Sequence, residues 1–412
     1  MAPSRPPRVL LVGHDFVPHR SSGDKNYWLG LVTHLAPRLD WLGVASIVHG
    51  EPARRRFAAG PTSVDLYTME PVYALTRLTA DREPHPPKCA GSFKRQPASL
   101  VDQPLTLLRH RKRLRSIVAR HEVEVIHFMD NVGVGAGLTR WQQRPATVTM
   151  SYLGFYTVNR LRSQYLSGCA RLASGIAVAN PMMATALRPR AMAGDRSRVI
   201  PWGSDPDPAV ADDLTRNSAR ARLAEGHGLT GDQLIVWTGH TQQLGDAELH
   251  LAYDAVRAVT RSHPDVEAVF LLKPECEPNR YRHLATDRIR VCSSAEAPPF
   301  GDHLLGADVF LAPVARADTI VTPPLTWIEA MQAGTPIVSS DAPGVAEALG
   351  PLQRDLIAPQ SRGPNGLVDI LARAVTGDGL PDRAGIRAWA SETYSLERSA
   401  EAYAEFWTTI RR

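Results

Sequence analysis

Residues 311–350 read LAPVARADTIVTPPLTWIEAMQAGTPIVSSDAPGVAEALG. The opening LAP predicts the end of a buried strand, and the paired prolines in TPPL predict the first turn of a helix, where a missing N–H costs nothing. Thr322 is expected to cap this helix. The free N–H groups of Leu325 and Thr326, together with the helix dipole, would then form an anion site suited to a diphosphate.

Glu329 follows about one turn deeper in the same expected helix, which is otherwise apolar. A carboxylate at this position can accept two hydrogen bonds from a ribose diol. The stretch therefore favours a nucleotide site, with the diphosphate over 322–326 and the ribose on Glu329. The alternative is an ordinary helix that starts after prolines and contains one satisfied glutamate.

Outward from this stretch, short apolar runs alternate with helical patterns, which predicts mostly parallel, doubly wound sheets. The runs expected to be strands are 8–13, 41–48, 123–129, 146–152, 175–179, 198–201, 234–238, 269–273, 289–292, 309–312 and 336–339. The alternation restarts near residues 205–232, so we expect two Rossmann-like domains that face a central cleft.

The expected organisation is an acceptor-side domain over 1–205, a donor domain over 206–385, and a C-terminal helix over 386–412 that crosses back to the first domain. Residues 60–103 are rich in Pro, Arg and Thr, and we expect them to form a long irregular excursion, either a lid or acceptor loop or a disordered segment.

The composition fits a globular chain of 412 residues with a net charge of +5. The positive excess favours anionic ligands such as phosphates. No nucleic-acid partner is expected, because no aromatic residues interleave the basic run at 109–115. The four cysteines are scattered and no apolar stretch is long enough to span a membrane, so we expect a cytoplasmic protein with reduced thiols. A peripheral membrane contact and the oligomeric state stay open.

The stretch 311–350 resembles the donor-binding signature of glycosyltransferase family 4. That signature has a proline-ended strand, E-x7-E, A-x-x-x-G-x-P-V and G-G-x-x-E, and the matching residues here are Glu329, Ala330, Met331, Gly334, Pro336, Gly344 and Glu347. The run 123–129 (VEVIHFM) resembles the family's D-V-V-H strand, and 199–205 (VIPWGSD) resembles its I-P-N-G-V-D crossover.

The resemblance implies a GT-B glycosyltransferase. Such an enzyme would move a sugar from a UDP- or GDP-sugar to a small-molecule or glycan acceptor, with retention of configuration, in secondary-metabolite or cell-envelope biosynthesis. The nucleotide-sugar is a substrate, and no cofactor or metal is expected. The D-x-D at 205–207 lies in the expected linker, and no histidine pair has zinc-ligand spacing with a third ligand.

Three charged residues of the family pattern are absent. Val321 stands at the position of the family's first Glu, His240 follows Gly239 in place of an Arg, and the Lys expected near Gly245 is missing. Lys273 is the only lysine of the second domain and ends a neighbouring strand, so we expect it to contact the diphosphate, helped by a protonated His240. An ordinary surface lysine is the alternative.

In the first domain, polar residues follow two expected strands. His14 follows the first expected strand, and the later residues 22–24 resemble the family's glycine-rich loop near the donor phosphate and the acceptor. The candidates are His14 and Asp130 as catalytic residues, and Ser22, Gly23, Asp24 and Asn131 on the acceptor side.

Two other classes stay open. A GT-B nucleotide-sugar epimerase would need carboxylates that move a proton at carbon, and a catalytically lapsed binding subunit would explain the missing charged residues. The glycines of GVGAG at 133–137 allow a dinucleotide fingerprint, but no acidic residue ends the next expected strand.

Overall fold

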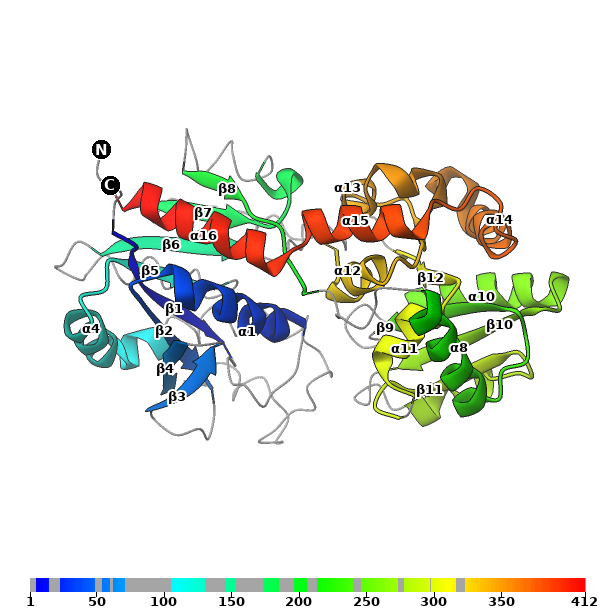
Figure 1. Cartoon of the computed structure of the whole chain (residues 1–412), viewed down its shortest axis with the longest axis horizontal. Helices are drawn as coiled ribbons and strands as arrows, with labels where there is room; N and C mark the ends of the chain where they lie inside the picture. Colours follow the sequence, from blue (N-terminus) through cyan, green and yellow to red (C-terminus); the bar gives the residue numbers. More distant parts are fainter. Residues whose placement is uncertain are drawn as a thin grey trace. The chain divides into compact units, whose positions relative to one another are not determined.

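The computed structural model describes residues 5–14, 23–48, 54–59, 62–70, 105–129, 146–152, 173–184, 196–205, 213–239, 246–272, 278–296, 298–315 and 323–411. The chain divides into two compact units, and each is described on its own (Figure 1). The first unit takes in the described residues up to Ser204 together with those from Tyr394 onward. The second unit takes in the described residues of Asp205–Thr393.

The first unit is built on an eight-stranded sheet, counted over the described residues, with the order β3-β4-β2-β1-β5-β6-β7-β8. All neighbouring strands are parallel except β3 and β4, which are antiparallel. The strands are β1 Arg8–His14, β2 Trp41–Ile47, β3 Arg54–Ala59, β4 Thr62–Met69, β5 Val125–Phe128, β6 Thr147–Tyr152, β7 Gly175–Val178 and β8 Ser197–Val199. The helical elements of this unit include α1 Gly23–Leu35, η1 Ala36–Arg38, α4 Arg111–Arg120 and α16 Leu396–Ile410.

The strand β4 corrects the sequence analysis, which assigned residues 60–103 to an irregular excursion. Residues 62–69 are a strand that pairs with β3, with Ala59 opposite Thr62 across a two-residue connection, Gly60-Pro61. Asp65 is buried in this hairpin, and its carboxylate lies 2.9 Å from the Arg56 guanidinium. The sequence does contain a feature that indicates this hairpin, a Gly-Pro dipeptide between two runs of residues that favour strands. Residues 71–103 lie outside the described residues.

The segment 386–412, expected as one helix, contains parts of two helices. Helix α15, Arg383–Thr393, ends in the second unit, and α16 starts at Leu396 in the first. Ser395 separates them because its hydroxyl accepts the Arg398 N–H at 3.3 Å, which caps the new helix.

Helix α16 packs closely on the first unit. A Cβ on Gly30 of α1 would lie 2.5 Å from Leu396 Cδ1, so a larger residue there would have to displace this leucine side chain between the two helices. The Trp407 indole N–H donates to His127 Nδ1 of β5 at 3.3 Å, and the Ser399 hydroxyl donates to the Pro201 carbonyl at 2.9 Å.

The second unit is built on a six-stranded parallel sheet, counted over the described residues, with the order β11-β10-β9-β12-β13-β14. The strands are β9 Gln233–Gly239, β10 Val266–Leu272, β11 Ile289–Ser293, β12 Val309–Ala312, β13 Ile337–Ser340 and β14 Ile357–Ala358. The helices are α8 Asp213–His227, α10 Ala247–Ser262, α11 Phe300–Gly306, α12 Leu325–Gln332, α13 Val345–Leu349, α14 Gly363–Val375 and α15, with η5 Pro278–Leu284, η6 Pro351–Leu356 and η7 Gln360–Arg362.

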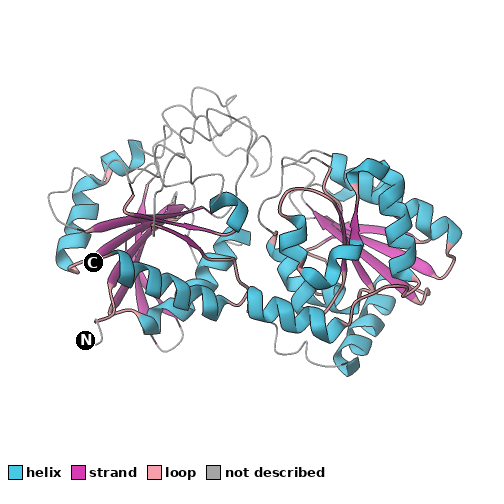
Figure 2. Ribbon diagram, turned by 90° about the horizontal axis from the view of Figure 1, so that it is seen from above, coloured by secondary structure: helices cyan, strands magenta, loops and turns pink. Residues whose placement is uncertain are grey.

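The central strands of this sheet are buried on both faces, as a parallel sheet between two helical layers requires (Figure 2). Asp308, just before β12, accepts the Leu234 N–H at 2.7 Å and the Arg216 guanidinium at 2.5 Å, which ties α8 to the amino ends of the strands. Both sheets confirm the doubly wound α/β class expected from the sequence.

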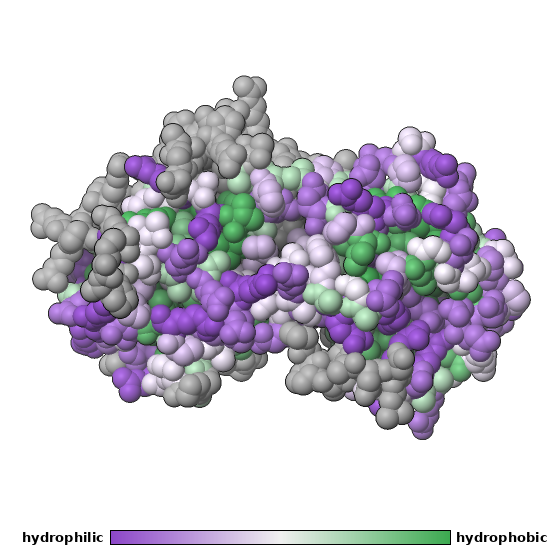
Figure 3. Space-filling model, turned by 45° about the horizontal axis from the view of Figure 1, so that its top comes forward, coloured by the Kyte–Doolittle hydropathy of each residue, from purple (hydrophilic) through white to green (hydrophobic). Residues whose placement is uncertain are grey.

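The surface of the chain is mainly hydrophilic on the face drawn in Figure 3, with smaller apolar patches between the polar side chains. Leu352 is the large apolar side chain that is clearly exposed among the described residues, at 46%. Within the described part of the chain, no helix is both long and apolar enough to cross a membrane.

Candidate functional site

The strand order of the second unit reverses between β9 and β12. The chain continues from β9 to β10 and β11 on one side, and from β12 to β13 and β14 on the other. In open α/β sheets, ligands bind outside the carboxyl ends of the strands at this reversal. We call the described residues around it the switch-point site: Gly239, Asp246–Glu248, Pro313–Ala315, Pro324–Thr326 and Glu329.

The start of α12 supplies free backbone donors to this site. Trp327 and Ile328 donate their N–H groups to the Pro324 carbonyl at 2.9 and 3.3 Å. The N–H groups of Leu325 and Thr326 precede these bonds and have no acceptor inside the helix. An anion at this end of the helix would meet two amide donors and the positive end of the helix dipole.

The expected cap of α12 is wrong. Pro324 occupies the N-cap with φ −56° and ψ 147°, and the helix begins at Leu325 rather than at the prolines. Pro323 precedes another proline, which disfavours the helical region for it, so the helix cannot start before Pro324. Thr322 lies outside the described residues. The free amide groups are therefore as expected, but no side chain in the described part caps them.

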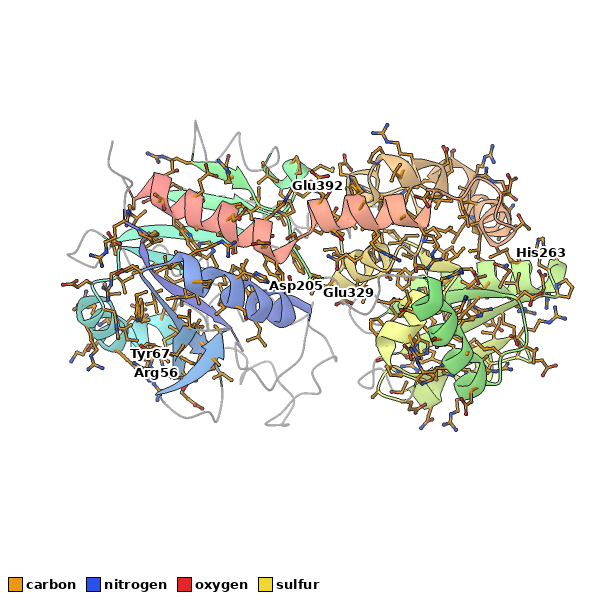
Figure 4. All side chains as sticks on the ribbon, viewed as in Figure 1. Arg56, Tyr67, Asp205, His263, Glu329 and Glu392 are labelled. Carbon is orange, nitrogen blue, oxygen red and sulfur yellow. The ribbon has the colours of Figure 1, made fainter. Side chains whose placement is uncertain are left out.

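Glu329 is half-buried in the fifth position of α12, between the buried side chains of Ile328 and Ala330. Figure 4 shows it at the opposite side of the second unit from His263, which follows the last residue of α10. His263 lies at the amino edge of the sheet, because its carbonyl accepts the N–H of Val266 in the first position of β10. Glu329 is therefore near the carboxyl edge, one turn away from the free amides.

Glu248 is a residue of this site that the sequence analysis missed. It lies in the first turn of α10, and its carboxyl group accepts the N–H of Ala315, which follows β12. Burial raises the pKa of Glu248 to about 7, against the opposing effect of the Ala315 N–H. The sequence feature that could have pointed to Glu248 is its place as an acidic residue in the first turn of an amphipathic helix that follows the central strand of the domain.

Two glycines of the resemblance have a backbone reason. Gly334 has φ +74° just after α12, and Gly344 has φ +89° as the N-cap of α13. Residues with a Cβ rarely adopt these angles. Glu347, the last residue of the matching pattern, is exposed on α13. Gly334 thus turns the chain before β13, at the amino edge of the sheet, and Gly344 turns it after β13, at the carboxyl edge.

The other residues expected on the donor side are only partly described. Gly239 ends β9, and a Cβ there would lie 2.6 Å from the Trp237 ring, so a larger residue at this strand end would have to displace that ring. His240, Lys273 and Thr322 lie outside the described residues, and their proposed contacts stay predictions.

The strand order of the first sheet reverses between β1 and β5, the two strands that the acceptor-side candidates follow in sequence. His14 ends β1, and the Met129 N–H, just after β5, donates to the Val12 carbonyl at 2.8 Å, so these two strand ends are adjacent. Gly23 begins α1. The side chains of His14 and Asp24, and all of Ser22, Asp130 and Asn131, lie outside the described residues.

No three His, Cys, Asp or Glu side chains in the described parts of the chain are grouped so that they would hold a metal ion. His127, the histidine of the strand that resembles the family pattern, is fully buried, and burial lowers its pKa to about 3. It is neutral at physiological pH and serves the packing of α16 rather than the site.

Comparison with known proteins gives a family match within the second unit and a shared fold. Residues 232–376 match the family described as Glycosyl transferases group 1. No curated protein sequence matches the chain significantly.

Among solved structures, sucrose-phosphate synthase from Thermosynechococcus elongatus has a TM-score of 0.70 at 17% identity, covering 98% of this chain and 99% of that one. HepE of Anabaena in complex with UDP has a TM-score of 0.66 at 14% identity, over 98% and 100% of the two chains. A UDP-forming trehalose-phosphate synthase from Burkholderia xenovorans has a TM-score of 0.67 at 13% identity, over 98% and 100%. At these identities the likeness establishes the fold.

The fold is that of the GT-B glycosyltransferases. Together with the family match over the second unit, it makes this protein an enzyme of the glycosyltransferase class. The matched segment contains the whole switch-point site.

Proposed function

We propose that this enzyme takes a sugar from a UDP- or GDP-sugar bound at the switch-point site and transfers it to a small-molecule or glycan acceptor. The observation that carries the proposal is the start of α12, where the Leu325 and Thr326 amides are free of helix partners with Glu329 one turn further along. In this proposal the amides and the helix dipole bind the diphosphate, and Glu329 accepts hydrogen bonds from the ribose hydroxyls.

The chemistry proposed is a metal-independent transfer with retention of configuration, as in family 4. The bond between the sugar's anomeric carbon and the phosphate oxygen breaks, and the acceptor hydroxyl oxygen bonds to the same face of that carbon. The departing phosphate oxygen takes the proton of the acceptor hydroxyl, so no protein nucleophile is needed. The role of the α12 amides is to stabilise the negative charge that develops on the diphosphate.

A uridine nucleotide is the first donor to test. HepE was solved with UDP, and the trehalose-6-phosphate enzyme from E. coli, with a TM-score of 0.65, was solved with UDP-2-fluoro glucose. A product in secondary-metabolite or cell-envelope biosynthesis remains our expectation, as does a cytoplasmic location.

The first test is a thermal-shift screen with UDP, GDP, ADP and dTDP on the wild-type protein and on Glu329→Ala. A ligand at 100 times its Kd stabilises the folded state by about 2.7 kcal/mol, which is a measurable rise in Tm. We expect one nucleotide to give that rise in the wild type and a much smaller rise in Glu329→Ala. Glu225→Ala, on an exposed position of α8, is the matched control and should respond like the wild type.

The same proteins separate an active transferase from a lapsed binding subunit. Release of the nucleoside diphosphate from the matching nucleotide-sugar, in the presence of a panel of acceptors, measures turnover. Tight binding without release on any acceptor would support the binding subunit. If the nucleoside diphosphate raises the Tm of Glu329→Ala and of the wild type equally, the proposed contact between Glu329 and the ribose is wrong.

A further inference from the structure

Two histidines of the second unit face each other through their ring nitrogens. His227 is the last residue of α8, and His303 lies in the middle of α11. Their Nε2 atoms are 2.7 Å apart, and their ring centroids are 5.0 Å apart. The two helices pack closely around this pair, since a Cβ on Gly306 of α11 would lie 2.7 Å from Leu223 Cδ1 of α8. The pairing of the rings therefore follows from helix packing.

The ring of His303 is oriented by its other nitrogen. His303 Nδ1 lies 3.1 Å from the Pro299 carbonyl oxygen, which can only accept, so the proton is on Nδ1 and Nε2 presents a lone pair. A histidine that binds a metal ion through one nitrogen is commonly held in this way, with the other N–H donated to a backbone carbonyl. Because His303 is buried, its lone pair is held toward His227.

His227 provides the adjustable side of the pair and the access to solvent. It is half-buried at the end of α8, and its Nδ1 makes no hydrogen bond with any described residue. The ring proton can therefore move from Nε2 to Nδ1, which leaves a second lone pair directed at His303. Two nitrogens that each lie about 2.1 Å from one ion are roughly 3.0–3.4 Å apart. The rings would have to separate by only about half an ångström, which the position of His227 at a helix end allows.

The charged groups next to the pair are matched within the protein. The Asp302 carboxylate accepts two hydrogen bonds from the Arg222 guanidinium, at 2.7 and 2.6 Å. On β11, Arg290 Nε donates to the His227 carbonyl at 3.0 Å, and the same guanidinium lies 3.9 Å from the Glu267 carboxylate. The uncharged ring nitrogens are thus left as the groups that can bind a ligand.

Both rings are also in the protonation state that a metal ion requires. Burial lowers the pKa of His303 to about 4. Burial and Arg290 lower the pKa of His227, and the charge of the exposed Glu296 opposes them. Both rings are therefore neutral at pH 7, and the neutral imidazole is the form that binds metal ions.

We propose that His227 and His303 form a binding site for a divalent transition-metal ion of the zinc class, which joins α8 to α11 through the two Nε2 atoms. Imidazole nitrogens suit Zn²⁺, Ni²⁺ and Cu²⁺, whereas Mg²⁺ and Ca²⁺ prefer oxygen ligands. In the described parts of the chain no third ligand completes a cluster, so water occupies the other positions on the ion. The ion stabilises the second unit, because its two ligands come together only in the folded chain.

The test compares Zn²⁺ binding by four full-length proteins. His227→Gln and His303→Gln each remove one ligand but keep a polar side chain. His250→Gln, on an exposed position of α10 in the same unit, is the matched control. Binding is measured by calorimetry, the Tm is recorded with and without Zn²⁺, and Mg²⁺ serves as the control ion.

At pH 7.5 we expect the wild type and His250→Gln to bind Zn²⁺ equally, and His227→Gln and His303→Gln to bind it about tenfold or more weakly. Zn²⁺ should raise the Tm of the first two proteins, and Mg²⁺ should leave it unchanged. In a crystal soaked with Zn²⁺, an anomalous-diffraction peak should lie about 2.1 Å from both Nε2 atoms.

The pH dependence gives a second readout, because protonation of a ring prevents it from binding the ion. Two ordinary imidazoles with a pKa of about 6.5 would lose roughly tenfold in affinity between pH 7.5 and pH 6. The wild type should lose less than about threefold, since burial keeps both rings neutral over this range.

Equal Zn²⁺ affinity in all four proteins, or an anomalous peak at other residues and none between these rings, would overturn the inference. Failure of the wild type to bind Zn²⁺ would do the same. If His303→Gln does not fold, His227→Gln decides the question, because its side chain is half-buried at a helix end. None of these outcomes bears on nucleotide binding at the switch-point site.

Discussion

His127 Nδ1 has two polar neighbours in the described part of the chain, the Thr149 hydroxyl at 2.9 Å and the Trp407 indole nitrogen at 3.3 Å. The Trp407 indole can only donate, so His127 Nδ1 must be the acceptor, and the ring proton lies on Nε2. Nε2 has no hydrogen-bond partner in the described structure, but the ring lies among those of Tyr403 and Trp28, with centroids 5.4 and 5.9 Å away. A histidine that resembles a family motif here holds a helix in place.

Replacement of His127 by Leu should therefore reduce stability rather than turnover. The Trp407 N–H would stay buried without an acceptor, at a cost of about 1–3 kcal/mol. Urea unfolding measures this cost. The double variant with Trp407→Phe should recover part of it, because the buried indole N–H is then absent and the Thr149 hydroxyl is the one described polar partner of His127 that remains. Loss of turnover with unchanged unfolding would indicate a catalytic role for His127 instead.

A pair of histidines links α8 to α11 in the second unit. His303 Nδ1 lies 3.1 Å from the Pro299 carbonyl and must donate to it, so His303 Nε2 accepts from His227 Nε2 at 2.7 Å. Burial lowers the pKa of His303 to about 4, helped by His227 and opposed by the Pro299 carbonyl and Asp302. Burial and Arg290 also lower the pKa of His227. Both rings are neutral at pH 7 in the folded state.

Stability should fall as the pH drops from about 6.5 to 4. The folded-state pKa of His303 is below that of the unfolded chain, so the unfolded state binds more protons in this window and the free energy of unfolding decreases. We expect a loss of about 2 kcal/mol from this residue, measured by urea unfolding at several pH values. His303→Gln should show a flatter dependence between pH 6.5 and 4, and parallel curves for the two proteins would contradict the assignment.

At the scale of elements, α12 is bounded by residues that fix where it starts and stops. The prolines delay its start to Leu325, and Gly334 ends it with a left-handed backbone and an N–H that donates to the Met331 carbonyl at 2.8 Å. A Cβ on Gly334 would lie 2.8 Å from the Arg383 carbonyl at the start of α15. The close approach of α15 therefore depends on this glycine.

Gly334→Ala should cost more than the left-handed backbone alone explains. Gly377 has a similar φ of +79°, but a Cβ there would meet no atom within 4 Å, so Gly377→Ala measures the backbone strain by itself. We expect about 1–2 kcal/mol for Gly377→Ala and roughly 1 kcal/mol more for Gly334→Ala, from urea unfolding. Equal costs would mean that the Arg383 backbone moves aside freely.

Some of these elements could be predicted from the sequence and others could not. The strands β1, β2, β9 and β12 follow from continuous apolar runs, because a strand buried on both faces has no polar positions. Strand β4 was missed because Asp65 interrupts its apolar run, and only the ion pair with Arg56 explains why an acid is buried there. Glu248 was missed because its partner Ala315 is distant in sequence and carries no side-chain signal.

At the scale of the whole molecule, α16 belongs to the first unit although it follows the second in sequence. The Arg411 guanidinium lies 2.9 Å from Glu124, and Arg38 of η1 lies 3.0 Å from Glu397. With the buried rings of Tyr403 and Trp407, these contacts make α16 part of the core of the first unit.

Deletion of residues 396–412 should therefore unfold the first unit and spare the second. Differential scanning calorimetry should lose one transition, while the transition that responds to the nucleoside diphosphate remains. The loss of each buried aromatic side chain costs about 3–5 kcal/mol, so the loss of several exceeds the free energy of unfolding of a typical domain. Loss of both transitions together would show that the two units unfold as one.

The sequence by itself determined the class of fold, the restart of the strand–helix alternation, and the presence of a helix after the paired prolines, because these depend on residues near one another in the chain. The tertiary structure decided which residues meet: Glu248 with Ala315, His127 with Trp407, and His227 with His303. Such pairs follow from strand order and helix packing, and their protonation follows from burial, neither of which a local pattern contains.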